Sequence, residues 1–242
     1  MKKFKSIIMV CLVLTLMLTM MVSAGAPITN EKEKSIDPSV KWDDKKAAQV
    51  EAEIDKVIKG ENVSTATFNV SNMTYVRSDT LDASDLPYAT ASSSYKLYKE
   101  DVTDASYDYY VVWMKGTGIN KPDTYLFDDS NLYEVRVGTT LNRTQDLITD
   151  WEPYADVTMN EQYANISLGV SHGGVNASIS EDVLLHRDHI GPQSIYTTSY
   201  FKAHWNGNYE GSQGVIGGPE MRVPKGTAYN YTISLFVDGG QF

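Results

Sequence analysis

Residues 165–180 read NISLGVSHGGVNASIS, and this stretch predicts an antiparallel β-hairpin. Apolar residues recur at every second position on both sides of Gly173-Gly174, as in two half-buried strands joined by a two-residue turn. Such a turn places Leu168 opposite Ile179, and all the apolar side chains then fall on one face. The other face carries asparagine and serine, so we expect it to be wet.

The rest of the chain after about residue 61 shows the same strand-and-turn punctuation. A continuous apolar run from Tyr109 to Met114 predicts a central strand covered on both faces. Shorter alternating stretches lie at 66–70, 95–98, 133–137, 195–205 and 229–237. Residues 206–227, with six glycines and two prolines, predict a long loop with at most one short edge strand. The predicted fold class is mainly β, an antiparallel β-sandwich preceded by one short amphipathic helix.

That helix is expected over residues 38–60, where apolar residues recur at helical spacing. They are Ala47, Val50, Ile54, Val57 and Ile58. Asp43 and Asp44 suit its first turn and Gly60 its end. The helix either packs on the β domain or forms a stalk near a membrane. The predicted organisation is a signal at 1–24, a linker at 25–37, the helix at 38–60 and one sandwich domain at 61–242.

Residues 1–24 have the pattern of a secretory signal peptide. Three lysines precede an apolar run from Ile7 to Val22, and Val22-Ser23-Ala24 offers small residues for cleavage. We therefore expect a secreted, extracellular protein without a membrane span after cleavage. The alternative is an uncleaved N-terminal anchor that leaves the protein facing outside.

The composition excludes several classes of function. The formal charge is −10, and removing residues 1–24 leaves 18 basic and 31 acidic residues, or −13. This acidity argues against nucleic acid and against anchoring on anionic lipid, because both need a basic face. The single cysteine, Cys11, lies in the predicted signal. A cysteine-free mature chain has no disulfide, no thiolate metal site and no cysteine nucleophile.

Two features suggest enzyme chemistry, and neither has the context that the chemistry needs. Residues 169–173, Gly-Val-Ser-His-Gly, match the nucleophile elbow around Ser171, but a strand pattern rather than a helix follows. The four histidines are His172, His186, His189 and His204, a number that suits a zinc site. A secreted hydrolase using Ser171 or a histidine-bound metal is thus an alternative. No catalytic residue is assigned, and a non-enzymatic role is favoured.

Acidic loops make calcium a candidate ligand, and no other cofactor is expected. Asp101, Asp104 and Asp108 lie close in the sequence, and calcium prefers clustered oxygen ligands. Aspartate in the loops of an acidic protein also serves turn formation and solubility.

Seven asparagines begin an Asn-x-Ser/Thr triplet, which is a glycan acceptor in a cell with the right transferase. They are Asn62, Asn69, Asn72, Asn142, Asn165, Asn176 and Asn230. Alternating polar strand faces produce the same triplets without any glycan.

Aromatic residues beside turns are the predicted binding residues: Trp151, Tyr154, Trp205 and Tyr209. Exposed rings stack on sugars or on partner side chains, whereas Trp151 and Trp205 could instead cap the core. The main interpretation is a secreted or cell-surface protein with a non-catalytic binding role, its partner a surface glycan or protein.

A second alternative is a secreted, toxin-like protein that oligomerises on membranes. In that hypothesis hairpin 165–180 crosses the bilayer. About 7 residues per strand is short of the roughly 9–11 that a spanning strand needs, which argues against it.

Overall fold

The structure, a computed structural model, describes residues 30–60, 68–121, 130–154, 158–159, 162–185 and 189–241. The predicted signal at 1–24, Asn62 and His186 lie outside these ranges. In chain order the elements are β1 (Glu31–Ile36), α2 (Asp44–Lys59), β2 (Phe68–Ser71), β3 (Met73–Asp85), β4 (Ala89–Glu100), β5 (Tyr107–Asn120), β6 (Ser130–Leu141), β7 (Leu147–Glu152), β8 (Thr158–Met159), β9 (Gln162–His172), β10 (Val175–Leu185), β11 (His189–Tyr196), β12 (Tyr200–Tyr209), β13 (Ser212–Pro224) and β14 (Tyr231–Gln241).

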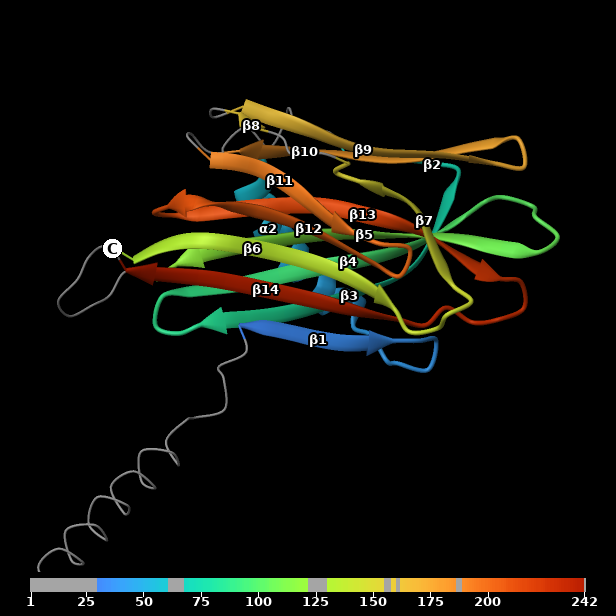
Figure 1. Cartoon of the computed structure of the whole chain (residues 1–242), viewed down its shortest axis with the longest axis horizontal. Coiled ribbons are helices and arrows are strands. Elements are labelled where there is room, and N and C mark those ends of the chain that lie inside the picture. The colour runs from blue at the N-terminus through green and yellow to red at the C-terminus, as the bar shows by residue number, and fades with distance from the viewer. Residues whose placement is uncertain are drawn as a thin grey trace, which may run out of the picture.

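The strands form three antiparallel sheets (Figure 1). One has six strands in the order β1-β14-β6-β12-β11-β8, and one has five in the order β3-β4-β5-β13-β7. The third has three strands in the order β2-β10-β9, and β9 has no partner on its outer edge among the described strands. The two larger sheets pack face to face, which confirms the predicted antiparallel sandwich.

Strand β5 is covered on both faces, as the apolar run at 109–114 predicted. Residues 109–116 are all buried. On one face, Met114 contacts Thr139 of the six-stranded sheet. On the other face, Trp113 and Lys115 contact Glu181 of β10. The molecule therefore has a third layer, formed by α2 and the three-stranded sheet, outside the five-stranded sheet.

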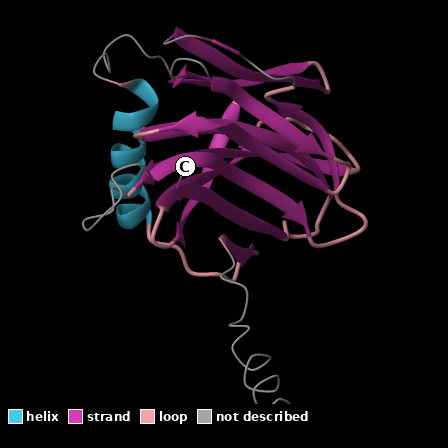
Figure 2. Ribbon diagram, turned by 60° about the vertical axis from the view of Figure 1, so that its left-hand side comes forward, coloured by secondary structure: helices cyan, strands magenta, loops and turns pink. Residues whose placement is uncertain are grey.

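Helix α2 packs on the sandwich (Figure 2). Of the two alternatives, packing on the β domain is therefore correct and a separate stalk is not. Asp43 is its N-cap and accepts a hydrogen bond from the Lys46 backbone nitrogen at 3.0 Å. Its own Ile54 and Ile58 are fully buried against the sandwich. No helix within the described ranges is both long and apolar enough to cross a bilayer.

The predicted linker at 25–37 contains a strand. Glu31–Ile36 forms β1, which pairs with β14 at the edge of the six-stranded sheet. Its sequence is almost entirely charged or polar, because an edge strand is held by its main chain and needs few buried side chains. The alternation that reveals other strands is therefore missing.

The prediction of a long loop at 206–227 is also wrong. Residues 212–224 form β13, a largely buried strand between β5 and β7. Its glycines are there because neighbours lie too close for a side chain. A Cβ on Gly214 would lie 2.6 Å from Ile58 of α2, and one on Gly218 would lie 2.9 Å from the Trp113 ring. These glycines serve packing and are not turn residues.

The hairpin β9–β10 has the predicted register and turn, but it is longer than predicted. Leu168 lies opposite Ile179, and both turn glycines have positive φ, 54° at Gly173 and 81° at Gly174. Each strand has 11 residues, whereas the sequence suggested about 7. On β10 the count fell short because Glu181 interrupts the apolar alternation before the strand ends.

We expect Gly174→Val to destabilise the protein by about 1–2 kcal/mol, the cost of a left-handed backbone for a residue with a Cβ. No atom lies within 4 Å of a Cβ built at this position, so the cost comes from the backbone alone. Urea unfolding measures it. Gly169→Ala is the control, since that site is equally open and has no positive φ. Equal midpoints for the two variants would contradict the assigned turn.

Candidate functional site

The hairpin β9–β10 contacts the two larger sheets through side chains, and its one main-chain ladder to another element is with β2 among the described strands. Its strands pair with each other and with the four residues of β2, and with neither of the two larger sheets. Seven apolar residues of its inner face are at most 7% exposed: Ala164, Ile166, Leu168, Val170, Ala177, Ile179 and Val183. Its outer face carries exposed Asn165, Ser167, Ser171 and Asn176. The hairpin is thus an amphipathic ribbon laid on the sandwich.

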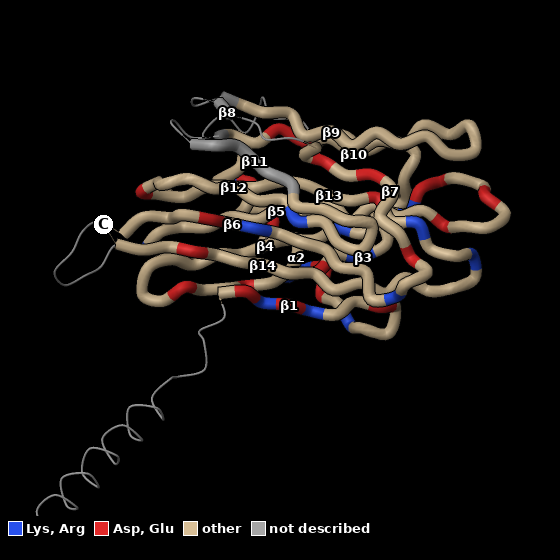
Figure 3. The backbone as a smooth tube through the Cα atoms, in the orientation of Figure 1, with Lys and Arg blue, Asp and Glu red and all other residues tan. Residues whose placement is uncertain are grey.

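Charge is scarce on this ribbon (Figure 3). Strand β9 contains no Lys, Arg, Asp or Glu, and β10 contains only Glu181 and Asp182. Asp182 accepts a hydrogen bond from Asn165 at 2.7 Å on the outer face. Glu181 lies on the inner face and is fully buried. The inner face therefore carries one acidic residue, Glu181, and one histidine, His172, at its tip.

Glu181 contacts a buried ion network that joins hairpin, helix and sheet. Its carboxylate lies 2.6 Å from Lys115 Nζ, and it accepts a hydrogen bond from Trp113 Nε1 at 3.2 Å. Lys115 also pairs with Glu51 at 3.1 Å and Asp55 at 3.0 Å, both on α2. Burial lowers the pKa of Lys115, but the three carboxylates outweigh it and raise the pKa above its usual value. Lys115 is therefore charged.

The tip of the hairpin docks on two buried acids. His172 Nε2 lies 2.7 Å from Glu220 Oε1 of β13. The His172 ring stacks on Tyr109, with centroids 3.9 Å apart. Thr149 donates a hydrogen bond to the other Glu220 oxygen at 2.5 Å. Glu100, at the end of β4, completes the group, and one ligand atom from each of Glu100, His172 and Glu220 lies within 4.8 Å of the other two.

Glu100 is buried without a donor. It is 2% exposed, and no described N–H or O–H group donates a hydrogen bond to either carboxylate oxygen. Burial, and then the neighbouring Glu220 carboxylate, raise the pKa of Glu100 to about 9. At neutral pH the Glu100–Glu220 pair therefore holds a proton.

We expect wild-type stability to fall as pH rises from about 4.5 to about 9. In this interval the folded protein keeps a proton on Glu100, whose raised pKa is about 9, while the unfolded chain releases it near 4.5. Glu100→Gln removes that proton difference and flattens the slope. Urea unfolding at pH 5 and pH 8, with a chelator present, measures both proteins. Parallel pH slopes would contradict the buried acid pair.

Of the predicted aromatic binding residues, two come together on the surface. Trp151 stacks on Tyr154 at 5.3 Å and on Tyr196 at 4.0 Å. Tyr154 is 61% exposed and Tyr196 45% exposed. We call Trp151, Tyr154 and Tyr196 the aromatic platform. Tyr196 was not predicted, because only the fold brings β11 beside the end of β7.

Trp205 is not a surface residue, contrary to its predicted binding role. It is fully buried in β12, on the same inward face as Phe201 and Ala203. Tyr209 is partly buried and packs against the core. Trp205 therefore belongs to the core, as the alternative interpretation had it. Binding through Trp151 and Tyr154 stays a prediction.

The predicted calcium residues do not converge on a common point. Asp101 accepts a hydrogen bond from Thr74, and Asp108 pairs with Lys99 at 2.9 Å. Asp104 accepts from the backbone nitrogens of residues 106 and 107, which is turn chemistry. Within the described part of the chain, Glu100, His172 and Glu220 form the group whose ligand atoms lie together.

The hydrolase motif lies in a strand-turn-strand setting. Ser171 is exposed in β9, and β10 follows after two residues, so the strand-to-helix turn of a nucleophile elbow is missing there. His204 pairs with Glu134 at 2.9 Å. The His189 side chain falls outside what the structure describes. A catalytic Ser171 has no support from this geometry.

Most of the predicted glycan acceptors are accessible. Asn69, Asn72, Asn142, Asn165 and Asn176 are exposed, and Asn230 is half-buried. Asn69, Asn165 and Asn176 lie in the three-stranded sheet, and Asn72 directly follows its strand β2. Glycosylation itself stays a prediction.

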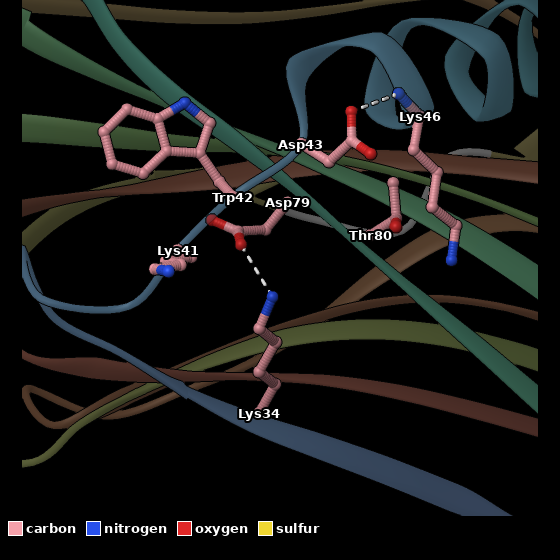
Figure 4. Close-up of a pocket in the computed structure, with 7 residues that line it drawn as sticks. All are labelled: Lys34, Lys41, Trp42, Asp43, Lys46, Asp79 and Thr80. Atoms are coloured by element: carbon pink, nitrogen blue, oxygen red, sulfur yellow. Dashed lines mark hydrogen bonds and ion pairs between the residues drawn. The ribbon is translucent and has the colours of Figure 1, made fainter.

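A pocket of about 280 Å³ lies beside the start of α2 (Figure 4). It is lined by Lys34, Lys41, Trp42, Asp43, Lys46, Asp79 and Thr80. Lys34 pairs with Asp79 at 2.8 Å, and Asp43 serves as the helix cap. Lys34 and both acids of this pocket are therefore already engaged with each other or with the helix.

No protein-family model matches the chain, and no curated protein matches it in sequence. Among solved structures, a protein described as a pore forming protein is similar with a TM-score of 0.41 and 10% identity, over 73% of this chain and 91% of that one. The Clostridium perfringens NetB toxin in its membrane-inserted form is similar with a TM-score of 0.32 and 10% identity, over 73% and 94%. Likeness this weak does not assign a function.

Proposed function

We propose that this protein is a secreted, membrane-active β protein whose hairpin β9–β10 leaves the sandwich and inserts into a lipid bilayer. One observation carries the proposal. The hairpin is an amphipathic ribbon with 11-residue strands, and among the described strands it forms no β-ladder with either large sheet. It can leave without breaking the sandwich ladders. This replaces glycan or protein binding as the main interpretation.

The dimensions and pattern of the ribbon suit a bilayer. A tilted membrane-spanning strand needs about 9–11 residues, with apolar residues toward lipid and polar residues toward water. The buried face from Ile166 to Val170 and from Ala177 to Val183 would meet lipid, and the Asn/Ser face would meet water. The same apolar side chains thus serve as core in one state and as lipid contact in the other.

Release has a cost at the two polar points of the inner face. Glu181 loses Lys115, and His172 loses Glu220. An acid on the lipid face costs less than the roughly 2–4 kcal/mol of a midplane Lys or Arg. These contacts keep the hairpin on the sandwich in water. On a membrane, burial of its apolar face in lipid would offset their loss.

Secretion and the aromatic platform fit the same function. The predicted signal delivers the protein outside the cell. Trp and Tyr rings favour the level of the lipid head groups. Trp151, Tyr154 and Tyr196 therefore offer a first contact with a membrane surface that does not depend on basic residues. This agrees with the acidic charge of the chain.

The test is dye release from phosphatidylcholine vesicles by the mature chain, residues 25–242. Release that increases with protein supports the proposal. Vesicle binding without release, measured by flotation, would overturn insertion and favour a second function, surface binding through the aromatic platform. Tyr154→Ala, which removes the most exposed ring of the platform, would then reduce binding. Glycans found on Asn165 or Asn176 by mass spectrometry of the native protein would also overturn insertion, because they cannot cross a bilayer.

A further inference from the structure

We infer that Glu100, His172 and Glu220 form a binding site for a divalent transition-metal ion, with zinc the best match. One ligand atom from each residue lies within 4.8 Å of the other two. His172 Nε2 and Glu220 Oε1 are already 2.7 Å apart. The site joins three segments that are far apart in sequence, the end of β4, the tip of β9 and the middle of β13.

The Glu100 carboxylate is the independent sign that a cation belongs there. It is 2% exposed, faces a second buried acid, and has no described hydrogen-bond donor. Proteins rarely leave a buried carboxylate unpaired, because its desolvation is not repaid. The nearby histidine contacts Glu220, so the polar neighbour of Glu100 in the site is a second acid, and no described cation or N–H group reaches either Glu100 oxygen. A metal ion would satisfy them.

The donor set selects the class of metal. One imidazole nitrogen and two carboxylates suit zinc and its neighbours, whereas calcium and magnesium prefer oxygen ligands throughout. Supporting contacts restrict two of the ligands. Thr149 holds the second Glu220 oxygen at 2.5 Å, and the Tyr109 ring stacks on His172 at 3.9 Å. Such outer contacts orient metal ligands.

A bound metal would tie the hairpin to the five-stranded sheet. Glu100 and Glu220 belong to that sheet, while His172 is the last residue of β9 before the turn. If the hairpin is the inserting segment, a consequence that rests on the proposed function, zinc would hold it in place and slow its release.

The experiment is a calorimetric titration of the chelator-stripped mature chain with zinc chloride, in the absence of lipid. We expect one ion per chain, and at least about tenfold weaker binding for both Glu100→Gln and His172→Gln. Glu100→Gln removes a buried acid and should fold, which circular dichroism checks. The matched control is His204→Gln, which removes a different buried His–Glu pair, with Glu134, and should leave affinity unchanged.

Two results would overturn the metal site: no zinc binding by the wild type, or binding that Glu100→Gln leaves unchanged. Dye release with and without zinc then separates the two proposals. Zinc binding with no release under any condition keeps the site and overturns the membrane function. Release from vesicles by a protein that binds no zinc keeps the membrane function and overturns the metal site.

Discussion

An oxidised Ser71→Cys/Ser178→Cys protein is expected to release no dye above background, and reduction is expected to restore release. Ser71 in β2 and Ser178 in β10 are register partners, with their hydroxyl oxygens 2.9 Å apart. Opposed residues of an antiparallel pair have the Cα spacing that a disulfide needs. Because β2 leads through Asn72 into β3, the bond would fasten the hairpin to the sandwich.

The chain provides a matched control for this lock. Asp82→Cys/Ser92→Cys places a disulfide between β3 and β4, whose residues 82 and 92 are also register partners in contact at 2.8 Å. Both strands stay in place in the proposed mechanism, so this oxidised variant should still release dye. The mature chain contributes no cysteine of its own. Full release by the oxidised Ser71/Ser178 variant would show that the hairpin does not have to leave.

Lys115→Met is expected to lower the free energy of unfolding by about 3–5 kcal/mol, the cost of breaking a buried ion pair from one side. Lys115 is the cation shared by Glu181, Glu51 and Asp55, and its side chain is only 3% exposed. Without it, Glu181 keeps Lys59 at 3.6 Å and the Trp113 hydrogen bond. These do not replace a cation at 2.6 Å. Urea unfolding at pH 7 gives the value.

The control for Lys115 is Lys56→Met. Lys56 pairs with Glu53 at 2.7 Å on the exposed side of α2, with both side chains more than half exposed. Exposed pairs contribute at most about 1 kcal/mol. A Lys115→Met protein no less stable than Lys56→Met would mean that the network does not hold hairpin, helix and sheet together.

The sequence revealed those parts of the fold whose cause is local. Hairpin β9–β10 follows from an alternating pattern around two glycines, and α2 follows from helical spacing and an aspartate cap. Strand β13 could not be found this way, because its glycines look like turn residues until Ile58 and Trp113 are seen against them. Strand β1 was missed because an edge strand can be polar throughout.

The candidate site was predicted only in part for the same reason. His172 was noted, but its partners Glu100 and Glu220 lie 72 and 48 residues away and have no pattern of their own. The burial of Trp205 did have a signal, because it is in phase with Phe201 and Ala203 along β12. Strand phase is thus better evidence for a buried ring than proximity to a turn.

The outer edge of β9, which has no partner among the described strands, has a consequence for kinetics. In lipid, each unpaired main-chain N–H or C=O group costs several kcal/mol, so one hairpin that enters alone is opposed along an 11-residue edge. Insertion becomes favourable when a neighbouring copy meets that edge. The initial rate of dye release should therefore rise as a power of protein concentration greater than one, with a lag at low dose that shortens as the dose increases.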